Sequence, residues 1–166
     1  MLTDSIKSQI RAIHGQIKTA MPNYQPRAGQ NKLVAEITKI VAGDYHKHER
    51  IGLIEAGTGT GKSLAYMLAV IPYALSQKKK VVIATATVAL QEQLVHKDLP
   101  FFQQHSKLLF EFSLVKGRQR YACIERLRQQ QKHPELFATA TTAEFNWQLL
   151  LDKWQQRQWL GDRDTL

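Results

Sequence analysis

A glycine-rich turn lies between an apolar segment and a helix-forming one, at Ile54-Glu-Ala-Gly-Thr-Gly-Thr-Gly-Lys-Ser63. Ala56–Ser63 fit the phosphate-loop pattern G-x-x-x-x-G-K-S/T except at the first position, where alanine replaces glycine. Glycines let successive backbone N–H groups converge on phosphate oxygens, and the following helix adds its positive end. The alternative is a glycine-rich turn with a chance Lys-Ser pair, which requires the spacing and both flanking segments to coincide.

The side chains of this loop predict how a nucleotide is held. Lys62 is expected to reach the β- and γ-phosphates, which makes it the candidate catalytic residue, and the Ser63 hydroxyl is expected to hold Mg²⁺. ATP and Mg²⁺ are therefore the expected cofactors. The residues predicted to contact the nucleotide here are Ala56, Gly57, Thr58, Gly59, Thr60, Gly61, Lys62 and Ser63.

The segments around the loop indicate an α/β fold. Short apolar runs at 51–55, 81–85 and 110–115 predict strands, and they alternate with predicted helices at Lys62–Leu75 and Val88–Val95. This order is typical of a doubly wound parallel sheet with flanking helices, which we assign to the P-loop NTPase (RecA-like) class. Apolar periodicity also predicts helices at Thr3–Ala20, Gln30–Ala42, Cys123–Lys132 and Ala143–Trp159.

Charge and composition narrow the class of partner. The 166 residues carry a net charge of +9 and have a pI of about 9.8, a balance that favours a polyanionic partner but also fits a merely basic enzyme. No run of about 18 apolar residues is present, and the first residues lack the features of a signal peptide. We therefore expect a cytoplasmic protein with no membrane partner. The one cysteine cannot form an internal disulfide.

Two motifs around the loop resemble those of a known family. Ile54–Ser63 resembles motif I of the XPD-like iron–sulfur helicases of superfamily 2, and Pro26-Arg-Ala-Gly-Gln30 resembles their Q motif. The resemblance implies that Arg27 and Gln30 contribute to nucleotide binding. The Gln30 amide both donates and accepts, which suits the N6 and N7 edge of adenine. The alternative is a polar residue that caps the second helix.

A third motif follows the second predicted strand. Thr85-Ala-Thr-Val-Ala-Leu-Gln-Glu-Gln-Leu94 resembles motif Ia of the same helicases. The resemblance implies that Thr85, Thr87 and Gln91 bind the phosphates of a single DNA strand without reading its sequence. Thr87 is also suited to cap the helix that follows, and the two roles are compatible.

A fourth motif, Lys116-Gly-Arg-Gln-Arg-Tyr-Ala-Cys123, resembles the element that leads into the first cluster cysteine of these helicases. The resemblance implies that Cys123 is the first of four ligands to a 4Fe-4S cluster. No cysteine follows it, so we expect the cluster in the intact protein only. The six Lys and Arg side chains between Lys116 and His133 fit a DNA-binding surface and a solvated helix face about equally.

The order and spacing of these motifs over 26–123 resemble most closely the bacterial DinG family. The resemblance implies an ATP-dependent 5′–3′ DNA helicase that acts from single-stranded DNA on forked or R-loop structures in DNA repair. It also implies three parts: an N-terminal helix at 1–25, the first part of the ATP-binding domain at 26–116, and the start of an iron–sulfur and helical insertion at 117–166. Protein partners are not indicated.

The sequence also limits what this chain is expected to do. No apolar strand ends in the Asp-Glu pair that a helicase uses for Mg²⁺ and water activation, and no second helicase domain follows. We therefore expect a truncated chain that binds nucleotide weakly and neither hydrolyses ATP nor unwinds DNA. The alternative functions are a small P-loop kinase or a nucleotide-binding regulatory domain, although no acceptor-site lid is recognisable. The phosphate loop argues against a nucleic-acid-binding module without enzymatic history.

Overall fold

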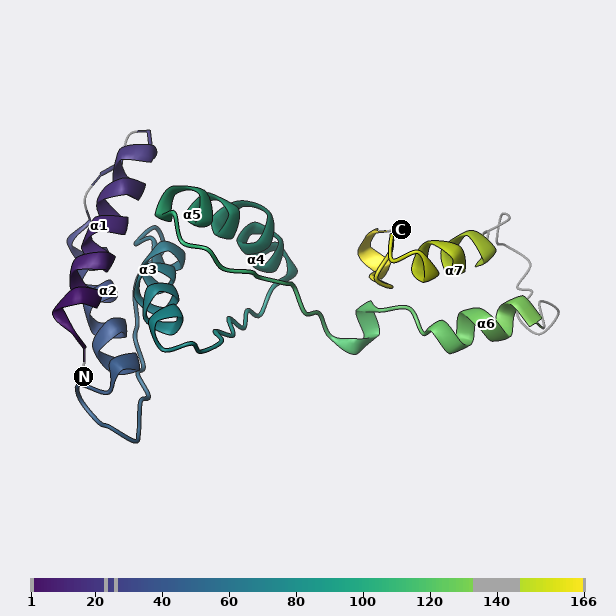
Figure 1. Cartoon of the computed structure of the whole chain (residues 1–166), viewed down its shortest axis with the longest axis horizontal. Helices are drawn as coiled ribbons and strands as arrows, with labels where there is room; N and C mark the ends of the chain where they lie inside the picture. The colour runs from purple at the N-terminus through teal and green to yellow at the C-terminus, as the bar shows by residue number, and fades with distance from the viewer. Residues whose placement is uncertain (1, 23, 26, 133–146, 166) are drawn as a thin grey trace. The chain divides into compact units, whose positions relative to one another are not determined.

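The computed structural model describes residues 2–22, 24–25, 27–132 and 147–165 (Figure 1). These residues form two compact units, Met1–Leu114 and Val115–Leu166. The phosphate loop and the Q-like motif lie in the first unit. The segment around Cys123 lies in the second.

Helices make up the regular structure of the first unit. The helices are α1 (Asp4–Ala20), α2 (Ala28–Ala42), α3 (Lys62–Ser76), α4 (Val88–Gln93), a π-helical segment at Leu94–Asp98, and α5 (Leu99–Ser106). The Thr3 side chain accepts a hydrogen bond from the Ile6 N–H and so caps α1. Gly43 ends α2 in the left-handed conformation that glycine adopts without strain. The predicted helices at Thr3–Ala20, Gln30–Ala42 and Lys62–Leu75 are therefore confirmed to within two residues at each end.

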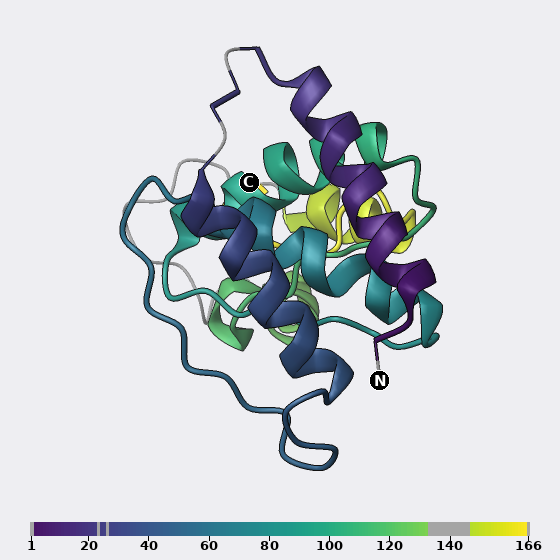
Figure 2. The same ribbon diagram turned by 90° about the vertical axis from the view of Figure 1, so that its left-hand side faces the viewer.

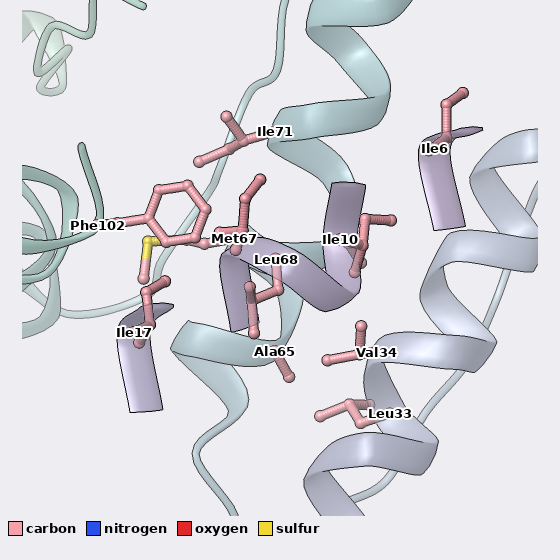
Figure 3. Packing of buried hydrophobic residues seen from close by; sticks show 12 residues of the cluster. Ile6, Ile10, Ile17, Leu33, Val34, Ala65, Met67, Leu68, Ile71 and Phe102 are labelled. Carbon is pink, nitrogen blue, oxygen red and sulfur yellow. The ribbon is translucent and has the colours of Figure 1, made fainter. Parts of the chain in front are cut away.

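The core of the first unit is built around α3. Its buried side chains Ala65, Met67 and Leu68 pack with the isoleucines of α1, the α2 residues Leu33 and Val34, and Phe102 of α5 (Figure 3). Figure 2 shows α1 and α2 beside α3. The predicted apolar face of α1 is confirmed, because Ile6, Ile10, Ile13 and Ile17 are all buried. This packing fixes the axis of α3 and hence the position of its N-terminus, where the phosphate loop ends.

The expected parallel sheet is not seen. None of the described residues forms a strand ladder, and the predicted strands at 51–55, 81–85 and 110–115 are without regular structure. Their apolar side chains include strongly exposed ones, with Leu53 and Val82 at 103% and 91% of full exposure. A helix makes its hydrogen bonds within one segment, whereas a parallel strand needs partners that are distant in sequence. Local apolar character alone therefore did not specify the sheet.

The helical region after Thr87 is longer than predicted. The sequence indicated a helix over Val88–Val95, but α4, the π-helical segment and α5 continue the helical backbone to Ser106. Pro100 lies in the first turn of α5, directly after the π-helical segment. Helical backbone therefore lies on both sides of this proline.

The second unit contains α6 (Ile124–Lys132), α7 (Trp147–Gln155) and short 3₁₀ turns at Arg118–Arg120 and Arg163–Thr165. Leu127, Leu150, Leu151 and Trp159 form its buried cluster. The predicted helix at Ala143–Trp159 is too long at its C-terminal end, and 143–146 lie outside the described residues. Trp159 is nevertheless buried, and its ring N–H donates to the Asp162 carbonyl over 2.8 Å. No helix among the described residues has the length and apolar character to cross a membrane.

Candidate nucleotide-binding site

Two glycines of the loop have left-handed backbones. Gly59 has a φ of 76°, and Gly61, the residue before α3, has a φ of 80°. Residues other than glycine adopt this left-handed backbone conformation only at a cost in free energy. At Gly61 an added Cβ would also overlap the Gln30 amide nitrogen. At Gly57 and Gly59 an added Cβ would meet nothing within 4 Å, so space is open above these two residues.

Side chains from the start of α2 hold the loop. Arg27 Nη1 donates to the Gly59 carbonyl, and Gln30 Nε2 donates to the Gly61 carbonyl over 3.1 Å. Both carbonyls belong to the left-handed glycines. The Q-like motif and the phosphate loop, about 30 residues apart in sequence, therefore meet in space. Gln30 does not cap α2, because its side-chain hydrogen bonds go to the loop and to Tyr24.

The environment of Gln30 includes two residues that sequence reasoning missed. The Tyr24 hydroxyl donates to Gln30 Oε1 over 2.8 Å, and His14 Nε2 lies 3.2 Å from the same hydroxyl. Gln30 is only 3% exposed. Burial, and then the charge of Lys18, lowers the pKa of His14, while burial raises the pKa of Tyr24. The available signal was an aromatic residue in the short connector just before the Q-like motif.

Lys62 and Ser63 begin α3, where the helix dipole is positive. Lys62 Nζ is solvent-exposed and donates to the Ala56 and Gly57 carbonyls over 2.8 and 2.9 Å. The ammonium therefore lies over the loop, within reach of an anion placed there. Burial raises the pKa of Tyr66, and a hydrogen bond from Ser63 opposes that shift, so the Ser63 hydroxyl lies against Tyr66. These groups have the chemistry that a phosphate and Mg²⁺ require.

The residues predicted to bind DNA lie at and after the turn that starts α4. Thr87 is the N-cap, and its hydroxyl oxygen accepts from the Leu90 N–H over 3.4 Å. The expected capping role is therefore confirmed, and an accepting hydroxyl retains its own hydrogen as a donor. Thr85 differs, because its hydroxyl donates to the Thr87 carbonyl over 3.2 Å. Gln91 lies one turn into α4.

Cys123 is a free, exposed thiol directly before α6. The described residues contain no group of three or more His, Cys, Asp or Glu side chains arranged to hold a metal ion. One cysteine supplies one thiolate, so the residues of this chain do not fit a four-thiolate cluster on their own.

The basic stretch before Cys123 is partly neutralised within its own unit. Lys116 Nζ lies 2.7 Å from Asp162 and 2.8 Å from Asp164, and its side chain is 5% exposed. Arg120 pairs with both oxygens of Asp164. Arg128 lies over the Trp154 ring, 5.6 Å from its centre. The sequence count of basic residues therefore overstates the positive charge that is available to DNA, and Trp154 and Trp159 serve packing.

Comparison with known proteins decides the family. The model of the DEAD/DEAH box helicase family matches residues 27–160, a range that includes the loop, Arg27, Gln30 and the α4 cap. The chain belongs to the DEAD/DEAH box helicase family. Membership implies a P-loop NTPase fold, of which the structure shows the loop and the helix after it.

The resemblance to DinG helicases is confirmed by individual relatives. The ATP-dependent DNA helicase DinG of Photobacterium profundum is 53% identical over 127 residues, which cover 76% of this chain and 18% of that protein. Its counterpart from Escherichia coli is 38% identical over 126 residues, which cover 76% of this chain and 17% of that protein. The chain thus spans less than a fifth of the length of these relatives.

Proposed function

We propose that this chain forms the ATP-binding part of an ATP-dependent DNA helicase. The proposal rests on two hydrogen bonds, from Arg27 to the Gly59 carbonyl and from Gln30 to the Gly61 carbonyl. They join two motifs, each predicted to bind nucleotide, into one site at the N-terminus of α3. A glycine-rich turn formed by chance would not be held from α2 in this way.

Each group at the site has a defined task. Lys62 exchanges its bonds to the Ala56 and Gly57 carbonyls for the β- and γ-phosphates, and Ser63 holds Mg²⁺. The loop N–H groups and the α3 dipole bind the remaining phosphate charge. Gln30 has a second amide hydrogen and a second oxygen lone pair for the adenine edge. Because the Gln30 side chain is buried, this role requires the residues around it to move when nucleotide binds, so that the amide becomes accessible to adenine.

DNA is the polymer that the other motifs fit. We place the phosphates of a single strand at Thr87 and Gln91, with Thr85 joining after it gives up its bond to the Thr87 carbonyl. The relatives named above are ATP-dependent DNA helicases, which supports a DNA partner. Movement from 5′ to 3′, action on forks and R-loops in repair, and a cytoplasmic location complete the proposal.

The chain is proposed to be one part of the catalytic machinery. It consists of the N-terminal helix at 1–25, the first part of the ATP-binding domain at 26–116 and the start of the cluster-bearing insertion at 117–166. Cys123 contributes one thiolate to a 4Fe-4S cluster whose other ligands lie in the intact protein. The sequence contains no Asp-Glu pair, so we expect the isolated 166 residues to bind ATP without hydrolysing it.

The test compares ATP hydrolysis by the intact helicase and by these 166 residues alone, each with and without single-stranded DNA. We expect DNA-stimulated turnover by the intact protein and none by the isolated chain. In the intact protein, Lys62→Ala should abolish turnover, while Lys80→Ala, which removes an exposed lysine outside the loop, should not. DNA-independent phosphate transfer to a small molecule would favour the kinase alternative. Rapid ATP hydrolysis by the isolated chain would refute the proposal that these residues bind ATP without hydrolysing it.

A further inference from the structure

A chain of hydrogen bonds connects helix α1 to the phosphate loop. His14 of α1 contacts the Tyr24 hydroxyl at 3.2 Å, and Tyr24, in the connector before α2, contacts Gln30 Oε1 at 2.8 Å. Gln30 of α2 then contacts the Gly61 carbonyl at 3.1 Å. Segments from three parts of the first unit thus converge on the residue that precedes Lys62.

The direction of each of these hydrogen bonds follows from the last acceptor in the series, the Gly61 carbonyl. The Gly61 carbonyl can only accept, so the Gln30 amide must present Nε2 to it and Oε1 to Tyr24. Oε1 can also only accept, so Tyr24 donates its single hydroxyl hydrogen to Oε1. The Tyr24 oxygen then accepts from His14, which must carry its hydrogen on Nε2. A flipped amide would place Oε1 against the Gly61 carbonyl, so only one orientation satisfies all the groups.

Burial makes this orientation costly to lose. Gln30 is 3% exposed, and a buried acceptor without a donor is penalised more heavily than an exposed one. Tyr24 and His14 are half-buried, and their rings also meet edge to face with centres 6.2 Å apart. Each bond polarises the next, so the Tyr24 hydroxyl strengthens the donation from Gln30 to Gly61.

We propose that Tyr24 and His14 are positioning residues that hold the Gln30 amide against the Gly61 carbonyl and thereby set the geometry of the phosphate loop. The inference rests on the proposed nucleotide binding, but it concerns the loop and not the base. Loss of the Tyr24 or His14 side chain should therefore weaken the binding of every ligand that uses the loop, whether or not the ligand carries adenine. If Tyr24 instead contacted the base, its loss would weaken the binding of ATP but not of tripolyphosphate.

The first test reads the hydrogen bond itself. The carbonyl ¹³C resonance of Gly61 responds to donation from Gln30, and Gln30→Ala gives its value without that bond. In the ligand-free chain we expect Tyr24→Phe and His14→Leu to shift the resonance toward the Gln30→Ala value. His14→Gln retains a donor near the Nε2 position and should restore the wild-type value. Tyr45→Phe is the matched control, because its hydroxyl bonds to Glu36 of the same helix, away from the loop.

The second test measures the dissociation constants of ATP and of inorganic tripolyphosphate. We expect Tyr24→Phe to weaken both by the same factor, about three- to tenfold, with Tyr45→Phe unchanged. An unchanged Gly61 resonance in Tyr24→Phe would overturn the inference, as would weaker ATP binding with unchanged tripolyphosphate binding. Undiminished ATP binding by Lys62→Ala would instead contradict the proposed function, while the Gly61 resonance would still decide the role of Tyr24.

Discussion

Lys116 Nζ lies 2.7 Å from Asp162 Oδ2, although the two residues are 46 positions apart. Asp164 bonds to the same ammonium and also to Arg120. Beside these ion pairs, the Ala122 N–H donates to the Gly161 carbonyl over 2.8 Å. The turn that carries Asp162 and Asp164 therefore holds the segment directly before Cys123. Lys116 and Arg120, which suggest a DNA-binding surface in the sequence, stabilise the second unit instead.

Acid should weaken the second unit. Hydrogen bonds from Lys116 lower the pKa of Asp162, and those from Arg120 and then Lys116 lower the pKa of Asp164. A carboxyl whose pKa is lower in the folded state stabilises it above the unfolded pKa and loses that contribution as pH falls through the folded value. We expect the denaturant midpoint of this unit to fall as the pH drops from about 5 to about 2.

Tryptophan fluorescence isolates this effect, because all three tryptophans lie in the second unit. Asp162→Asn should lower the midpoint near neutral pH and flatten its dependence on acid. Asp152→Asn is the control, since it removes a carboxylate of the same unit that bonds to Gln148 and not to Lys116. Equal pH profiles for wild type and Asp162→Asn would refute this role of the ion pairs.

Two loop glycines should respond differently to alanine. Gly61→Ala places a side chain on a residue with a φ of 80° and against the Gln30 amide, so we expect a loss of about 1–2 kcal/mol in the free energy of unfolding. Gly57→Ala meets no atom within 4 Å and should change it by less than about 0.5 kcal/mol. Urea unfolding followed by circular dichroism measures both, and equal costs would show that Gly61 is not held as described.

Thr87 allows helix capping to be separated from DNA binding. Aspartate also caps helices well, so Thr87→Asp should preserve folding, but its charge repels a DNA phosphate. In the intact helicase we expect weaker binding to single-stranded DNA. Thr3→Asp at the α1 cap is the matched control. Equal DNA affinity for the two variants would exclude a phosphate contact at Thr87.

The parts of the fold that were correctly predicted depend on local sequence. The four isoleucines of α1 recur at helical spacing, Gly43 ends α2, and the glycine-rich loop leads directly into α3. Helical hydrogen bonds and caps are made by residues that are close in sequence. The expected strands depend on distant partners, and the runs at 51–55 and 81–85 carry no such information.

The candidate site divides in the same way. Arg27, Gln30 and Lys62 stand out because their motifs have fixed spacing. Tyr24 belongs to no motif that we recognised, and its importance comes only from the hydroxyl bond to Gln30. Asp162 could not be paired with Lys116 from sequence, since opposite charges 46 residues apart have no local signature.

We propose that the loop from Ala56 to Ser63 binds the phosphates of ATP. The equilibrium affinity of the 166-residue chain for ATP with Mg²⁺ tests this claim when it is measured for wild type, Lys62→Ala and Lys80→Ala. We predict that Lys62→Ala loses binding with its circular dichroism spectrum unchanged, while Lys80→Ala, which makes the same change in charge outside the loop, binds like wild type. Wild-type affinity in Lys62→Ala would contradict the claim.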